Sequence, residues 1–138
     1  MSPKAAGYSG TPLPKKLGIP ATGRALFVGA PDYFAKLVGP LPPGLDVASR
    51  ATPGLDYIHV FTLREADLQR RLEQLVPKLA KNGAMWISWP KRSSGVATDI
   101  TEDVIRRHAL RAGVVDVKVC AVDETWSGLK LVYRLKDR

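Results

Sequence analysis

The chain has 138 residues, of which 45% are hydrophobic and 25% are charged, and its formal net charge is +8 at pH 7. These values predict a globular domain, and no apolar run approaches the roughly 20 residues of a membrane-spanning helix. No apolar segment follows the first positive charge, so we expect neither a secretory signal nor membrane association. Because Cys120 is the single cysteine, an intramolecular disulfide and a cysteine-based zinc site are excluded, which is typical of a cytoplasmic protein.

The positive charge is unevenly distributed. A leading segment without any acid contains Lys4, Lys15, Lys16 and Arg24, and two further cations are adjacent in a loop near residue 91. A basic balance favours an anionic small molecule, nucleic acid or an acidic protein surface as partner. An ordinary solvated surface is the alternative, because no recognised nucleic-acid motif accompanies the charge.

Residues 1–23 contain closely spaced glycines and prolines, which predict an extended arm rather than a helix or strand. We expect Leu13, Leu17 and Ile19 to pack this arm against the surface of the domain. Residues 24–138 are then predicted to form that single domain.

Three apolar runs in the first half of the chain predict strands. Residues 24–29 are nearly all apolar, which suits a strand buried on both faces. Pro31 then favours the first turn of a short helix that ends at Gly39. Residues 45–49 form a weak second strand, and residues 56–61, rich in β-branched and aromatic side chains, form a third.

The clearest pattern predicts a helix over residues 64–81. Its apolar stripe repeats at helical spacing and consists of Leu68, Leu72, Leu75 and Leu79. Thr62 with Glu65 three residues later resembles a capping box, and Gly83 supplies a left-handed stop. Pro77 lies inside this span, so we expect it to kink the helix or shorten its last turn.

The second half of the chain predicts a strand, a helix and a closing hairpin. Residues 84–89 form the strand, and Asp99 with Glu102 makes a second box-like helix start. Residues 115–122 and 129–135 form the last two strands. The loop of about six residues between them favours an antiparallel hairpin.

This alternation of strands and helices predicts an α/β fold, a small Rossmann-like three-layer domain with a mostly parallel sheet. We expect the strand order 2-1-3-4-6-5, closing with the antiparallel C-terminal hairpin. One connection is tight, because residues 50–55 must cross over strand one and reach only about 20 Å when extended. If they cannot cross, strand two pairs at an edge in the opposite sense.

The chain carries G-Y-S-G-T-P-L at residues 7–13, W-P-K at 89–91 and W-S-G-L-K at 126–130. These motifs resemble an uncharacterised bacterial family that is frequent in actinobacteria and is catalogued as a domain of unknown function. The resemblance covers nearly the whole chain but implies little about activity, because none is established for the family. Some members look like regulators with a two-cysteine redox switch, a role that one cysteine does not support. The strand order also resembles a pared-down methyltransferase fold, and a fold analogy alone supplies no activity.

Neither common phosphate-binding motif, G-x-G-x-x-G or G-x-x-x-x-G-K-[ST], is present. After the first strand, Gly29 stands alone where a cofactor-binding turn needs two or three glycines, and Pro31 removes a backbone N–H. The second strand ends in Ser49 and Arg50 rather than in the acid that holds a ribose. We therefore expect no cofactor, and we interpret this turn as a short link into a helix.

Nucleophilic and metal chemistry have little support in the sequence. Cys120 lies inside a predicted strand without a neighbouring histidine, which is typical of a small core residue. His59 is in the middle of a strand and His108 is on the inner face of a helix. Histidines in such places, without acids at metal spacing, are more often core or boundary residues than ligands. We expect no metal site, and no redox switch at Cys120 alone.

The loop after the strand at residues 84–89 is the best candidate for a site. Carboxyl ends of parallel strands meet at one edge of the sheet, where ligands bind in such folds. Its cations, hydroxyls and nearby indole suit a flat anion, and the helix start after Thr98 adds a second anion-binding element. The acids after the fifth strand form either a polar pocket there or only an internal salt bridge. The residues predicted at this edge are Gly29, Thr62, Trp89, Lys91, Arg92, Ser93, Ser94, Asp123, Glu124 and Trp126.

Two functions remain open from the sequence. The first is a non-enzymatic binding or regulatory module with an anion-binding edge, which the lack of any catalytic signature favours. The alternative is a reduced methyltransferase-like or nucleotide-dependent enzyme. The turn at Gly29 discriminates between them, because such an enzyme needs backbone amides open to a ligand there.

Overall fold

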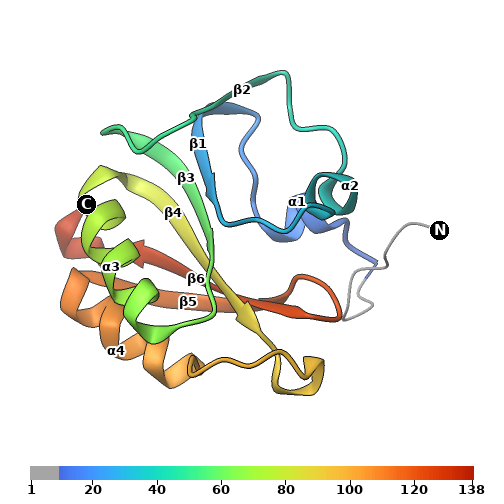
Figure 1. The fold of residues 1–138 in the computed structure, drawn as a ribbon. Helices are drawn as coiled ribbons and strands as arrows, with labels where there is room; N and C mark the ends of the chain where they lie inside the picture. Colours follow the sequence, from blue (N-terminus) through green and yellow to red (C-terminus); the bar gives the residue numbers. More distant parts are fainter. Residues whose placement is uncertain (1–9) are drawn as a thin grey trace.

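A six-stranded sheet forms the centre of the domain (Figure 1), in a computed structural model that describes residues 10–138. The strands are β1 (Thr22–Val28), β2 (Gly44–Val47), β3 (Leu55–Phe61), β4 (Leu79–Pro90), β5 (Val114–Ala121) and β6 (Trp126–Tyr133). Their order in the sheet is β2-β1-β3-β4-β6-β5. The first four strands pair in parallel, whereas β6 is antiparallel to both β4 and β5. The predicted α/β class, strand order and closing hairpin are therefore confirmed.

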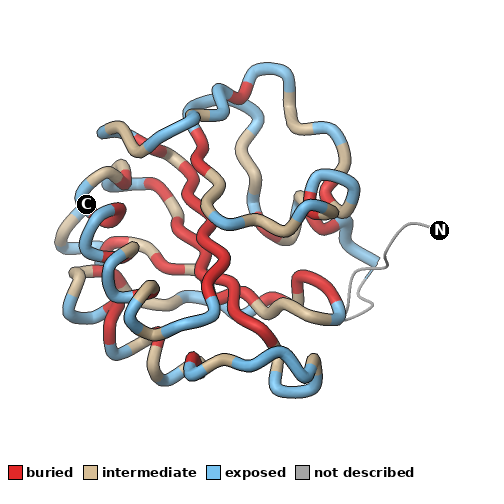
Figure 2. Tube along the Cα trace, in the orientation of Figure 1, coloured by how far each residue is buried: buried red, intermediate tan, exposed pale blue. Residues whose placement is uncertain are grey.

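Helices cover the two faces of the sheet unequally (Figure 1). The α-helices of the described chain are α1 (Leu13–Lys16), α2 (Phe34–Val38), α3 (Glu65–Leu75) and α4 (Glu102–Ala112), and the 3₁₀ turns are η1 (Val76–Lys78), η2 (Arg92–Ser94) and η3 (Leu135–Asp137). Buried residues of α3 and α4 share one apolar cluster with the sheet, and those of α1 and α2 share the other. In Figure 2 the buried residues concentrate in the central strands. No helix within residues 10–138 is long and apolar enough to cross a membrane.

The tight crossing from β2 to β3 is made without a helix. Ala48 donates its backbone N–H to the carbonyl of Ala25 at 2.7 Å, and Ala48 and Ala51 pack against the α3/α4 cluster. The segment therefore crosses β1 on that face, and β2 pairs in parallel with β1. The alternative expectation, an antiparallel β2 at the edge of the sheet, is therefore wrong.

The helix predicted over residues 64–81 is too long. α3 ends at Leu75, a 3₁₀ turn contains Pro77, and the chain enters β4 at Leu79. Pro77 has no N–H to donate to the preceding turn, which explains why the helix stops early. Leu79 is buried as predicted, but from a strand. Gly83 is likewise not a helix stop, because a Cβ there would meet the backbone oxygen of Asp56 at 2.9 Å inside the sheet.

The predicted helix caps at Thr62 and Asp99 are wrong. Thr62 does not cap α3, because its hydroxyl donates to the carboxylate of Asp67 at 2.7 Å. Asp99, predicted to begin α4, instead accepts the backbone N–H of Glu65 at 2.7 Å at the start of α3. Thr101 caps α4 by accepting the N–H of Val104 at 3.2 Å. A side chain distant in sequence thus holds the start of α3, whereas α4 is capped by the residue that directly precedes it.

The described part of the N-terminal arm, residues 10–23, contains a short helix. Residues 1–9 lie outside the described residues, and α1 forms where no helix was predicted. Leu13 and Leu17 are buried, so their predicted packing is confirmed. The indole N–H of Trp86 donates to the carbonyl of Leu17 at 2.7 Å, which ties α1 to the middle of β4.

Candidate ligand-binding edge

The carboxyl end of β1 is closed by a contact that glycine alone allows. Gly29 has φ +69°, and a Cβ there would lie 2.7 Å from the backbone oxygen of Phe61 at the end of β3. Both the left-handed backbone and this close approach require glycine. The identity of Gly29 is therefore explained by the fold itself, without any bound ligand.

The turn between β5 and β6 lies beside the end of β4. The buried carboxylate of Asp123 accepts the N–H groups of Thr125 at 2.8 Å and Trp126 at 2.7 Å, and Lys91 donates its N–H to the carbonyl of Thr125 at 2.7 Å. Burial, and then a hydrogen bond with Asp123, raise the pKa of the Tyr33 hydroxyl. The loops that follow β1, β4 and β5 therefore meet here. Asp123 is committed to holding this turn.

The sheet divides the aromatic residues predicted at this edge. Trp126 packs in the α1/α2 cluster, with its ring edge-on to Phe61 at a centroid distance of 5.1 Å. Trp89 packs in the α3/α4 cluster instead. Thr62 is buried and bound to Asp67, and Glu124 is exposed. The two indole rings thus pack on opposite faces of the sheet.

The hydroxyls of Ser94 and Thr98 are already hydrogen-bonded to backbone groups. Ser94 donates to the carbonyl of Lys91 at 2.7 Å and accepts the N–H of Val96 at 3.1 Å. Thr98 donates to the carbonyl of Leu63 at 2.6 Å. Arg92 lines a groove of about 410 Å³ on the α3/α4 face, with Trp89 among its walls. Ser93 is exposed.

The start of α4 already carries its own negative charges. Glu102 and Asp103 occupy its first turn, and both pair with Arg106. Acids in that position interact favourably with the positive end of the helix dipole. They occupy the place that an external anion would take, which weakens the predicted role of this helix start.

A group of lysines gathers on the α1/α2 face beside the β5–β6 turn. Lys118 and Lys130 are direct cross-strand partners, and the Lys118 ammonium lies 6.0 Å from the centre of the Trp86 ring. Burial raises the pKa of the Cys120 thiol, and the charges of Lys16, Lys118 and Lys91 act to lower it. Three lysines from different elements thus act on the same thiol, and Lys130 is the cross-strand partner of one of them. We call Lys16, Lys91, Lys118 and Lys130 the lysine patch.

Within residues 10–138 no lysine of this patch forms an ion pair, whereas arginines and His108 form all those found there. Lys16 and Lys91 were noted from the sequence, whereas Lys118 and Lys130 were not. Each of these two is flanked by apolar residues in a hairpin strand, and this alternation is the signal that could have found them.

The two histidines are core residues, as predicted. His59 is fully buried, its Nε2 lies 2.7 Å from the Ser88 hydroxyl oxygen, and burial lowers its pKa to about 3. His108 is buried between the helices, with Nε2 2.7 Å from a carboxylate oxygen of Glu65. No group of three or more potential metal ligands occurs within residues 10–138.

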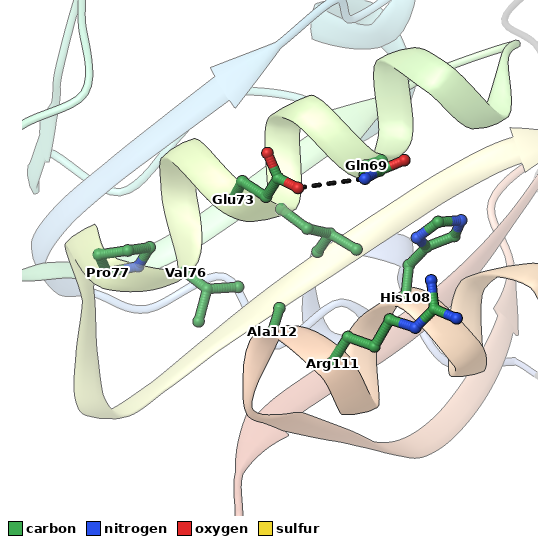
Figure 3. Close-up of a pocket in the computed structure, with 8 residues that line it drawn as sticks. Gln69, Glu73, Val76, Pro77, His108, Arg111 and Ala112 are labelled. Atoms are coloured by element: carbon green, nitrogen blue, oxygen red, sulfur yellow. Dashed lines mark hydrogen bonds between the residues drawn. The ribbon is translucent and has the colours of Figure 1, made fainter.

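A groove of about 260 Å³ lies between α3 and α4, and Figure 3 shows residues of both helices that line it. Gln69 and Glu73 of α3 line one side and hydrogen-bond to each other at 3.2 Å, and His108 and Arg111 of α4 line the other. His108, followed by Arg107, lowers the pKa of Glu65 through a hydrogen bond. The contacts of Glu65 with Arg107 and His108 link the two helices, which is a structural role.

Comparison with family models and with curated proteins gives no match, so the resemblance to the uncharacterised bacterial family stays a hypothesis. Solved structures of methyltransferases are similar in fold. A SAM-dependent methyltransferase from Aquifex aeolicus has a TM-score of 0.61 and 16% identity, covering 85% of each chain. The magnesium protoporphyrin IX methyltransferase of Synechocystis, with bound SAH, has a TM-score of 0.60 and 8% identity, covering 88% of this chain and 81% of its own.

The likeness to LepI in its complex with SAM has a TM-score of 0.53 and 14% identity, and this chain spans 39% of the length of LepI. At such identities the likeness shows the fold alone. The domain therefore has a methyltransferase-like Rossmann fold, as its strand order suggested.

The residues at the ends of β1 and β2 do not fit adenosylmethionine. Gly29 is the only glycine of its turn and is held against Phe61, and Pro31 offers no N–H. After β2 come Ala48, Ser49 and Arg50, with no acid to bind a ribose.

Proposed function

We propose that this domain is a binding module for a polyanionic ligand, held at the lysine patch beside the β5–β6 turn. The observation that carries the proposal is the cross-strand pair of Lys118 and Lys130, with two further lysines whose charges act on the same Cys120 thiol and no ion pair to any of them in the described chain. The module uses a methyltransferase-like fold without methyl transfer.

The facing ammonium groups of Lys118 and Lys130 repel each other, which lowers the stability of the free protein. Like charges directly opposite each other on neighbouring strands are destabilising, by roughly 0.2–1 kcal/mol per pair. A bound anion would remove that repulsion and would also accept hydrogen bonds from the ammonium groups. The lysines come from α1, the loop after β4, β5 and β6, so the fold brings them together only in the native state.

The ligand that fits this patch carries at least two negative charges, because single charges would leave most of the lysines unneutralised. Lys91 belongs both to the predicted edge and to the patch, and the half-buried Trp126 packs on the α1/α2 face, so part of the predicted edge adjoins the lysine patch in this proposal. Arg92 lines the groove on the other face and is not part of it.

The alternative is a methyltransferase-like enzyme, which the similar solved structures favour at the level of fold. It requires adenosylmethionine to bind at the ends of β1 and β2, where the residues do not fit that cofactor. The two functions therefore predict different ligands at different places.

Calorimetric titration with inorganic pyrophosphate, ATP, a short single-stranded RNA and adenosylmethionine separates them. We expect a phosphate ligand to bind at 20 mM salt and to weaken at 200 mM salt, because exposed charges are screened beyond roughly 10 Å at 0.1 M. Replacing Lys91 and Lys118 together by Ala should weaken binding at least about tenfold, since two charge-assisted hydrogen bonds are lost. Arg92→Ala should leave the affinity unchanged.

The matched control replaces Lys78 and Lys136 by Ala, which removes the same charge near the opposite end of β4. Equal weakening by both pairs would show that only net charge matters and would contradict the proposal. Binding of adenosylmethionine that is insensitive to the patch lysines would favour the enzyme.

A further inference from the structure

The face of the sheet near β1 and β2 is incompletely covered. α2 has five residues, so it spans only about 8 Å along its axis. Phe27 points from β1 toward this helix and contacts Phe34 at a ring-centroid distance of 5.8 Å, yet it remains only half-buried. The uncovered space is a groove of about 620 Å³ beside α2, which we call the α2 groove.

The walls of the α2 groove are rigid and mostly apolar. Phe27 and Phe34 supply aromatic surface, and Pro31 and Pro40 stand in the loops at the two ends of the helix. The fixed φ of proline restricts both loops, so the groove is largely preformed. Its volume lies within the roughly 300–1,000 Å³ of small-molecule sites, which are typically apolar with a few placed polar groups.

Asp32 supplies the charge of the α2 groove. Among the described lining residues it is the one charged side chain, and it is exposed at the turn after β1. A carboxylate beside aromatic walls selects a ligand with a flat apolar ring and a cationic amine that reaches the acid. This chemistry is opposite in charge to that of the lysine patch.

We infer that the α2 groove is a second binding site, which takes a small aromatic amine with its ring against Phe27 and Phe34 and its ammonium group at Asp32. The inference does not depend on the proposed function, because it uses different residues and a ligand of opposite charge. The groove begins at the same turn after β1 that offers no fit to adenosylmethionine, and its walls continue along α2 to Val38 and on to Leu41.

Tryptamine and indole-3-acetate test this inference, because they share the indole ring and differ in the sign of their charge. Backbone amide chemical shifts from nuclear magnetic resonance would report both affinity and location. We expect tryptamine to shift amides within residues 27–41 and indole-3-acetate to bind there about tenfold more weakly or not at all. Asp32→Asn should weaken tryptamine about threefold to tenfold and leave the weak binding of indole-3-acetate no worse.

Ala35 lines the groove from an exposed helix position, so Ala35→Phe should fill the groove and abolish tryptamine binding without unfolding the protein. Ala66→Phe on the exposed side of α3 is the matched control and should bind tryptamine normally. Equal binding of the two indoles, shifts centred outside residues 27–41, or normal binding by Ala35→Phe would each overturn the inference. The variant with Lys91 and Lys118 replaced should bind tryptamine as well as the original chain does, so failure of this site and failure of the lysine patch are distinguishable.

Discussion

The two faces of the sheet differ in how completely they are covered and in how their charges are paired. On one face, α3 and α4 have 11 residues each, or about 16 Å of helix, and their arginines pair with acids. On the other face, α1 and α2 have four and five residues, the lysines are unpaired in the described chain, and a groove stays open. We therefore expect the first face to supply most of the stability, and we propose the second face for ligand binding.

The largest expected effect tests the covered face. Leu72 is almost fully buried between α3 and the sheet, so Leu72→Ala should lower the free energy of unfolding by about 2–5 kcal/mol through lost burial and a residual cavity. Val47 of β2 is 47% exposed, and Val47→Ala should change stability by less than about 0.5 kcal/mol. Urea denaturation of both variants measures the difference. A loss below about 0.5 kcal/mol for Leu72→Ala would show that the assigned face is wrong.

The next effect concerns the buried histidine of the less covered face. His59 has a pKa of about 3 in the folded protein, against 6.5 when it is solvated, because burial disfavours its charged form. Below pH 6.5 the unfolded chain takes up a proton that the native protein refuses until about pH 3. His59 therefore lowers stability as the pH falls through this window, and it has no such effect above pH 6.5.

At pH 5 this contribution amounts to about 2 kcal/mol relative to pH 7. His59→Gln removes the titration but keeps a group able to hydrogen-bond to Ser88. Between pH 7 and pH 5 the original chain should lose about 2 kcal/mol more than the variant, as measured by urea denaturation at each pH. His108 and the carboxylates are common to both proteins and cancel. Parallel pH profiles would mean that His59 accepts a proton inside the fold.

Much of this fold follows from local sequence patterns. The apolar runs of β3 and β4 and the stripe at Leu68, Leu72 and Leu75 predict buried elements correctly, because burial dictates those residues wherever the elements lie. The predicted end of α3 was wrong because Leu79 continues the helical spacing of the leucines although it belongs to a strand. The spacing of apolar residues does not reveal where a helix gives way to a strand when a buried leucine fits the pattern of both.

The candidate site was predictable in part for a similar reason. Parallel strands end at one edge, so Lys91 and the turn containing Trp126 could be placed together. The face of the sheet on which each side chain lies depends on the alternation at the strand ends. Alternation could have indicated Lys118 and Lys130 separately, but their direct pairing depends on a register shift between Asp116 and Lys118, which no local pattern reveals.

A smaller effect on stability is expected at the N-terminal cap of α4 on the covered face. Thr101 caps α4 through its hydroxyl, so Thr101→Ala should cost about 1 kcal/mol, and Thr101→Ser should restore most of it. Hydrogen exchange should show the loss first in the amides of the first turn of α4. If the amides of β1 and β2 lost protection equally, the two faces would not be energetically separable.

The smallest effect is the most informative about the lysine patch, because it sets stability against binding. Lys118→Glu converts a repulsive cross-strand pair with Lys130 into an attractive one, so the variant should be about 0.5 kcal/mol more stable than the original chain at low salt. The gain should shrink at 1 M salt, where the Debye length is about 3 Å.

Lys136→Glu makes the same charge change at an exposed position beyond β6 and serves as the control for net charge. Binding of pyrophosphate should be lost in Lys118→Glu and kept in Lys136→Glu. A variant that is no more stable than the control at low salt would mean that the patch is not repulsive, and the main physical argument for an anionic ligand would then fail.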